Sequence, residues 1–172
     1  QQLPVVFCLD RAGLVGQDGP THHGVFDMAF LRCIPNLIIF APMNEMELRN
    51  IMYTAQLGLD GPIAIRYPRG RGVQLEWENS FERIATGSAR CLKEGSKIAV
   101  LTIGHIGNVV AKMLTEINQP ESIGHYDMRF VKPLDEKTLL KIYTQYDHIV
   151  TVEDGCAMGG FGSAVLELAN RE

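Results

Sequence analysis

The chain has 172 residues, enough for one large domain or two small ones with a hydrophobic core. A net charge of −4, with 46% hydrophobic and 21% charged residues, is typical of an ordinary globular protein. This charge gives no electrostatic reason to expect nucleic acid or an anionic membrane as a partner. No apolar run approaches the ~18 residues of a membrane span, and the four cysteines form no C-x-x-C pair. We therefore expect reduced thiols in a cytoplasmic protein.

Short apolar runs rich in β-branched residues recur along the chain, each bounded by turn residues. Such continuous runs favour a parallel sheet that is covered on both faces. The predicted strands are residues 5–9, 37–40, 63–66, 98–103, 123–128 and 148–152.

Helical patterns lie between these strands. Asn44 is a predicted N-cap with Glu47 at the N3 position, and apolar residues follow at helical spacing. A second helix is predicted to open at residues 133–136, and a third after Gly159 and Gly160. Strands that alternate with helices predict an α/β fold, with mainly parallel sheets and helices on both faces.

Residues 71–89 interrupt this alternation. They contain glycines, a polar run and Trp77, and we interpret them as a linker between units 1–70 and 90–172. The chain opens on Gln1 without an initiator Met and closes inside a helical pattern at Glu172. We therefore expect an internal fragment of a longer protein, with two partial domains.

The densest polar segment is residues 10–24, which follows the first predicted strand. It contains the guanidinium group of Arg11, the carboxylates of Asp10 and Asp18, and the imidazoles of His22 and His23, among four glycines and a proline. Open α/β sheets bind their ligands at the carboxyl ends of strands. The bland alternative is a solvated loop whose aspartates cap turns. The concentration of titratable groups at this position favours a site, but composition does not name the reaction.

This loop, D-R-A-G-L-V-G-x-D-G-P-T-H-x-G, resembles the pyrimidine-binding domain of the 1-deoxy-D-xylulose-5-phosphate synthase family, which are transketolase-like thiamine-diphosphate enzymes. Four more stretches agree with that family in order and spacing. They are residues 31–36, 66–70, 127–135 and 158–163. Residues 18–22 also resemble transketolase itself, whereas 11–13 and 66–70 favour the synthase family. The resemblance implies the C-terminal part of a thiamine-pyrimidine-binding domain in 1–70 and the N-terminal part of a transketolase C-terminal domain in 90–172.

The resemblance also implies a reaction. Enzymes of this family condense pyruvate with D-glyceraldehyde 3-phosphate, with loss of CO2, for isoprenoid, thiamine and pyridoxal biosynthesis. They are cytoplasmic homodimers that use thiamine diphosphate and Mg2+. The family holds this cofactor through residues upstream of Gln1. We therefore expect no cofactor-binding or metal-binding residue here, no bound cofactor, and no activity of these 172 residues alone.

Carried over residue by residue, the resemblance makes Arg11 and Arg69 the grip on the acceptor phosphate. Asp18 and His22 are the catalytic pair at the reacting end of the acceptor. Planar guanidinium groups suit a phosphate because each can form two hydrogen bonds to it. Histidine has a pKa near neutrality, which suits a proton donor to a developing alkoxide. His23 matches no family role, and we expect a structural one.

Two kinds of alternative function stay open. One is another enzyme of the superfamily, either a transketolase or the β subunit of a 2-oxo-acid dehydrogenase. The other is a non-catalytic module of the same fold.

The sequence offers weaker site candidates as well. We expect close packing rather than phosphate binding for the glycines at 159–162, and turn chemistry for Glu153 and Asp154. A structural role is expected for His105, and a solvated side chain for Arg71.

Overall fold

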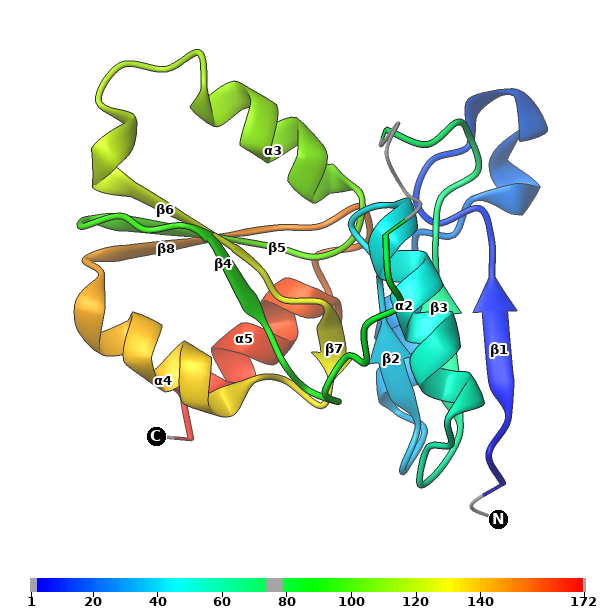
Figure 1. Cartoon of the computed structure of the whole chain (residues 1–172). Coiled ribbons are helices and arrows are strands. Elements are labelled where there is room, and N and C mark those ends of the chain that lie inside the picture. Colours follow the sequence, from blue (N-terminus) through cyan, green and yellow to red (C-terminus); the bar gives the residue numbers. More distant parts are fainter. Residues whose placement is uncertain (1–2, 74–78, 172) are drawn as a thin grey trace.

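A computed structural model describes residues 3–73 and 79–171 and shows two four-stranded sheets with helices packed against them (Figure 1). Trp77, which we assigned to the linker, lies outside the described residues. Within these residues, no helix is long and apolar enough to cross a membrane.

The first sheet has the strand order β1-β3-β2-β7. Its strands are β1 (Val6–Leu9), β2 (Ile38–Phe40), β3 (Ile63–Arg66) and β7 (Phe130–Lys132). Strands β1 and β2 both pair in parallel with β3, and β7 is antiparallel to β2. The carboxyl ends of β1 and β3 therefore meet at one edge, at the top of Figure 1. This places residues 10–24 beside the segment that follows β3.

The second sheet has the order β4-β6-β5-β8. Its strands are β4 (Arg90–Lys93), β5 (Ile98–Thr102), β6 (Ile123–Asp127) and β8 (His148–Val152). β5 is parallel to both β6 and β8, whereas β4 is antiparallel to β6. All six predicted strands are present, so the prediction of mainly parallel sheets is confirmed. The sequence did not indicate β4, which is short and polar, or β7, which continues the apolar run of β6.

The described part of the chain contains five α-helices, of which α5 follows the last strand. They are α1 (Asp27–Arg32), α2 (Glu45–Gln56), α3 (Ile106–Leu114), α4 (Glu136–Gln145) and α5 (Phe161–Ala169), with short 3-10 turns η1 (Gly16–Asp18), η2 (Pro20–His22) and η3 (Pro120–Ser122). The predicted N-cap is confirmed, because the Asn44 side chain accepts a hydrogen bond from the Glu47 amide at 3.0 Å. In the second sheet α3 covers one face, while α4 and α5 cover the other (Figure 1).

One hydrophobic core joins the two sheets. Ile39 and Ala64 of the first sheet lie in the same cluster as Ala99 and Leu101 of the second. The opposite face of the first sheet packs against Ile51 of α2 in a separate cluster. Strand β7 contributes Val131 to the shared cluster and Phe130 to the α2 cluster. The strand therefore ties the two halves of the chain together, and the domain boundaries at 70 and 90 stay a prediction.

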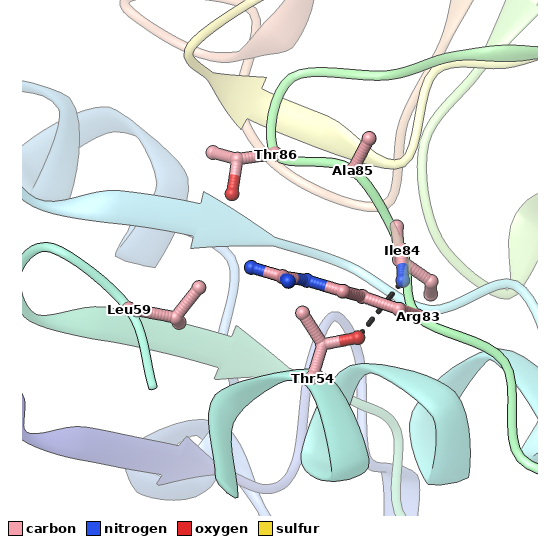
Figure 2. Close-up of a pocket in the computed structure, with 6 residues that line it drawn as sticks. All are labelled: Thr54, Leu59, Arg83, Ile84, Ala85 and Thr86. Atoms are coloured by element: carbon pink, nitrogen blue, oxygen red, sulfur yellow. Dashed lines mark hydrogen bonds between the residues drawn. The ribbon is translucent and has the colours of Figure 1, made fainter. Parts of the chain in front are cut away.

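The part of the predicted linker that includes Glu82 and Ile84 packs along α2. The Ile84 amide donates to Thr54 Oγ1 at 2.9 Å, and the Glu82 amide donates to Asn50 Oδ1 at 3.2 Å. Figure 2 shows the shallow pocket of about 270 Å3 that this packing leaves, with Leu59 and the Arg83 side chain at its sides. Leu59 lies near the amino end of β3. The pocket is therefore remote from the sheet edge where α/β proteins bind ligands.

Candidate functional site

Residues 10–24 form a loop that closes on itself just beyond β1. The Gly13 amide donates to the Gly24 carbonyl at 2.9 Å, and the Gly24 amide donates to the Arg11 carbonyl at 3.0 Å. The Ala12 amide bonds the carbonyl of Tyr67, which follows β3, at 3.0 Å. Arg11 is in the left-handed region with φ 61°, which is uncommon for a residue with a side chain. We call residues 11–13 and Gly24, where the two ends of the loop meet, the neck of the loop. These bonds hold the neck against the first sheet.

Three of the four predicted site residues meet in this region. Arg11 Nε donates to Asp18 Oδ2 at 2.8 Å, and Arg69 Nη1 donates to Asp18 Oδ1. We call Arg11, Asp18 and Arg69 the loop cluster. Arg11 Nη1 also bonds Asp10 Oδ2 at 2.6 Å. The two arginines, distant in sequence, thus converge on one carboxylate.

The electrostatics of the loop cluster follow from these bonds. Hydrogen bonds from Arg69 and Arg11 lower the pKa of Asp18 to about 2. The bond to Asp18 raises the pKa of Arg11 in turn. Arg69 and Arg11 remain partly open to solvent, at 55% and 34% side-chain exposure. Asp18 is therefore ionised at neutral pH, and the guanidinium groups of both arginines remain accessible.

The histidines of the loop have different surroundings. His22 ends η2 and is exposed, and its Nδ1 lies 3.0 Å from Thr21 Oγ1. Among the described residues this is its only side-chain hydrogen bond, so the structure does not bring His22 into contact with the loop cluster. His23 Nδ1 accepts a hydrogen bond from the Val15 amide at 3.1 Å. The bond gives His23 a role in holding the loop, as expected.

A cleft of about 470 Å3 adjoins the loop cluster, between the first sheet's loops and α3. Its lining includes Ala12 and Leu14 of the loop, Arg69 and Arg71 after β3, and His105 at the start of α3. The volume is in the range of small-molecule sites, which often lie at domain interfaces. Arg69 belongs to both the cleft and the loop cluster, so a ligand in the cleft has access to its guanidinium group.

The glycines before α5 do not form an open anion site. Glu153 accepts hydrogen bonds from the amides of Phe161 and Gly162 at 2.9 and 3.0 Å. Its carboxylate therefore already satisfies the donors at the helix N-terminus. A Cβ built on Gly160 would overlap the Cys156 carbonyl. These contacts support the expectation of close packing at 159–162.

Sequence reasoning did not anticipate a second group of ion pairs, which joins α2 to β4, β6 and the turn before β7. Glu47 receives two hydrogen bonds from Arg129, at 2.8 and 2.9 Å, and an ion pair from Arg90 at 3.1 Å. Arg90 Nε also bonds Asp127 Oδ2 at 3.0 Å. We call these four residues the seam cluster. Arg90 aside, the sequence signal was present, because Arg129 and Asp127 belong to the family-like stretch 127–135 and Glu47 to the predicted cap.

Burial separates the seam cluster from the loop cluster. The Glu47 side chain is 4% exposed and that of Asp127 is fully buried. Burial raises the pKa of Asp127 to about 6, against the opposing effect of Arg90. Neighbouring His125 is also buried, and burial together with Arg90 lowers its pKa to about 4. The carboxylates of the seam cluster are thus part of the packed interior, while the side chains of Arg90 and Arg129 stay partly exposed.

Metal ligands are not grouped in the described parts of the chain. No three His, Cys, Asp or Glu side chains among residues 3–73 and 79–171 gather closely enough to hold an ion. The chemistry that the geometry does support is recognition of an anion by the exposed arginine pair.

The chain belongs to the transketolase family. Residues 1–73 match the transketolase pyrimidine binding domain, and residues 87–172 match the transketolase C-terminal domain. Relatives named 1-deoxy-D-xylulose-5-phosphate synthase align over 97% of the chain. That of Cytophaga hutchinsonii is 58% identical and that of Bacteroides thetaiotaomicron 59% identical. The chain spans only 27% and 26% of the length of these two relatives.

Solved transketolase structures have the same architecture. A split-gene transketolase, described as an inactive β4 tetramer, superimposes with a TM-score of 0.82 at 29% identity. That match covers 99% of this chain and 55% of the other. Transketolase from Campylobacter jejuni gives a TM-score of 0.63 at 20% identity, over 95% of this chain and 29% of the other, which supports the fold alone.

Proposed function

We propose that this chain supplies the acceptor-phosphate wall of a 1-deoxy-D-xylulose-5-phosphate synthase. Such an enzyme joins pyruvate to D-glyceraldehyde 3-phosphate with release of CO2. The observation that carries the proposal is the convergence of Arg11 and Arg69 on the two oxygens of one carboxylate. Two guanidinium groups that grip a carboxylate in this way can also grip a phosphate. The relatives' name supports the choice of reaction.

The phosphate of the acceptor would take over donors that Asp18 now engages. A dianionic phosphate offers more acceptor oxygens than one carboxylate, and both arginines are open enough to turn toward it. Asp18 is then released to hydrogen-bond the polar end of the acceptor. His22, exposed on the same loop, is the proposed proton donor to the aldehyde oxygen as that oxygen gains negative charge.

Thiamine diphosphate, when bound, supplies the carbanion that attacks pyruvate. The described residues contain no set of acidic side chains suited to Mg2+. We propose, as the resemblance to the family implies, that the diphosphate and its metal are held by parts of the enzyme outside this chain. The proposed contribution of this chain is to bind and orient the acceptor and to provide a proton.

The test uses a full-length enzyme that contains this chain. Arg69→Ala should raise KM for glyceraldehyde 3-phosphate roughly 10- to 150-fold, since charge-assisted bonds contribute about 1.5–3 kcal/mol. KM for pyruvate should change little. Arg71→Ala is the matched control, because Arg71 lines the cleft but has no place in the loop cluster. An equal rise of both KM values would remove Arg69 from the acceptor site.

His22→Ala should instead lower kcat, because its hydrogen bond matters most when charge develops on the aldehyde oxygen. An unchanged kcat would make His22 an ordinary loop residue. Product analysis with pyruvate and glyceraldehyde 3-phosphate separates the synthase from a transketolase, a 2-oxo-acid dehydrogenase β subunit or a non-catalytic module. The homodimer and the lack of cofactor binding by these 172 residues stay predictions. Calorimetry with thiamine diphosphate and Mg2+ tests the latter.

A further inference from the structure

The second half of the chain reaches the neck of the loop at Asp154. This aspartate follows β8, and its side chain lies against the Cα atom of Gly13. A Cβ built on Gly13 would overlap all the terminal atoms of the Asp154 carboxylate. Gly13 also has φ 73°, in the region that favours glycine. The close approach and the backbone conformation therefore both depend on the absence of a side chain at position 13.

The carboxylate of Asp154 is itself held in place. Asp154 Oδ2 lies 3.3 Å from His105 Nε2, at the start of α3. Burial lowers the pKa of His105, with Arg66 acting in the same direction and Asp154 against it. The 3.3 Å approach is a close polar contact between the imidazole and the carboxylate. His105 thus contacts the carboxylate oxygen of Asp154 that also faces Gly13.

A buried arginine completes the support of the neck. Arg66, 1% exposed, donates to the backbone carbonyl of Asp154, to the Gly24 carbonyl at 2.8 Å and to Asp27 Oδ2 at 2.7 Å. Gly24 is the residue that pairs with Arg11 and Gly13 across the neck. Both sides of the neck are therefore supported: Arg66 bonds Gly24, and Asp154 lies against Gly13.

This support acts on the loop cluster through a short path. Gly13 is two residues from Arg11, whose left-handed backbone conformation persists only where its surroundings enforce it. If the Asp154 side chain is removed, the neck can shift and the Arg11 backbone can relax to an ordinary conformation. Its guanidinium group would then no longer point toward Asp18, where it now meets Arg69.

We propose that Asp154 and His105 are positioning residues for the anion site, so that the second half of the chain sets the geometry of the loop cluster without contributing a residue to it. The proposal rests on the proposed function insofar as the loop cluster binds the acceptor phosphate. The support of the neck by Asp154 does not depend on the proposed function, because it follows from the contacts of Asp154.

The first experiment measures hydrogen exchange in the 172-residue chain, and it needs no ligand. Asp154→Ala should increase exchange of the Ala12, Gly13 and Gly24 amides at least tenfold, while the amide of Leu101 in β5 stays protected. Asp154→Asn keeps the shape and an oxygen acceptor for His105, and it should restore protection. Asp147→Ala, an exposed aspartate just before β8, is the matched control. Unchanged neck exchange in a folded Asp154→Ala chain would overturn the proposal.

The second experiment uses the full-length enzyme. Asp154→Ala should raise KM for the phosphorylated acceptor about five- to twentyfold, with kcat and KM for pyruvate within twofold, and His105→Ala should show a smaller rise. A fall of kcat with both KM values unchanged would contradict a positioning role. If Asp154→Ala loosens the neck but Arg11→Ala and Arg69→Ala leave the acceptor KM unchanged, the proposed function fails and the support of the neck remains. If the arginine variants raise that KM and Asp154→Ala does not, the positioning proposal fails alone.

Discussion

The loop cluster and the seam cluster each combine two arginines with carboxylates, and they differ in how deeply the carboxylates are buried. In the loop cluster Arg11 and Arg69 share Asp18 at the surface. In the seam cluster Arg129 and Arg90 share Glu47 of α2, and Arg90 also bonds buried Asp127. The comparison teaches that an arginine pair around a carboxylate does not by itself indicate a site. Solvent access decides whether the carboxylate can be exchanged for a ligand.

Physical chemistry explains the different consequences. An exposed ion pair contributes about 0–1 kcal/mol, because water and salt compete with each partner. A buried pair behaves differently when it is broken, because the remaining charge has no water to solvate it. Loss of a carboxylate should therefore affect ligand affinity in the loop cluster and folding in the seam cluster.

The largest expected effect is that of Glu47→Ala. This change leaves Arg129 without its two hydrogen bonds and removes one partner of Arg90. The free energy of unfolding should fall by about 3–5 kcal/mol, measured by urea denaturation of the 172-residue chain. Glu116→Ala, at an exposed position after α3, should change it by less than about 0.5 kcal/mol. A loss below about 1 kcal/mol for Glu47→Ala would show that the seam cluster is solvated like the loop cluster.

A second effect concerns pH. The pKa of His125 is about 4 in the folded chain, below its ordinary value of 6.5. Stability from the neutral imidazole is therefore present above pH 6.5 and is lost as pH falls toward 4. The loss should be on the order of 2–3 kcal/mol. Asp127, with a pKa of about 6, acts with the opposite sign, because its protonated form favours folding and this contribution is lost as pH rises through 6.

The difference between variants isolates the histidine. Between pH 7 and pH 4 the free energy of unfolding of the wild-type chain should fall by about 2–3 kcal/mol more than that of His125→Asn. His22→Asn, at the exposed loop histidine, should follow the wild-type curve. Parallel curves for wild type and His125→Asn would show that His125 is solvated in the folded state.

The smallest effect on folding is expected from Asp18→Asn, which should leave the free energy of unfolding within about 1 kcal/mol. The same change removes the internal competitor for Arg11 and Arg69. Affinity of the 172-residue chain for inorganic phosphate should then rise roughly tenfold, since a hydrogen bond to a charged group contributes about 1.5 kcal/mol. Titration calorimetry at constant ionic strength measures this, with exposed Asp60→Asn as control. Weaker phosphate binding would mean that Asp18 holds the arginines in place rather than competing with the ligand.

The sequence carried much of the fold and part of the candidate site. Six strands and the Asn44 cap follow from periodicity and capping chemistry, which act within a few residues. The loop at residues 10–24 was also visible, because polar residues crowd behind an apolar strand. A structural role for His105 stays a prediction, and its neighbour Asp154 could not be named from the sequence. The convergence of Arg11 and Arg69 was predicted, whereas the carboxylate between them was expected elsewhere in the site.

Local patterns thus determined six strands, the Asn44 cap and the polar loop, and the resemblance of the motifs indicated the transketolase-like family. Only the tertiary structure decided that β7 joins the first sheet, that Glu47 pairs with Arg129 across 82 positions and that Asp154 lies beneath Gly13. The physical reason is that charged residues follow no periodic pattern that reveals their partners. Their pairing is set by how the two sheets pack around a shared core, and that packing depends on contacts between residues far apart in the chain.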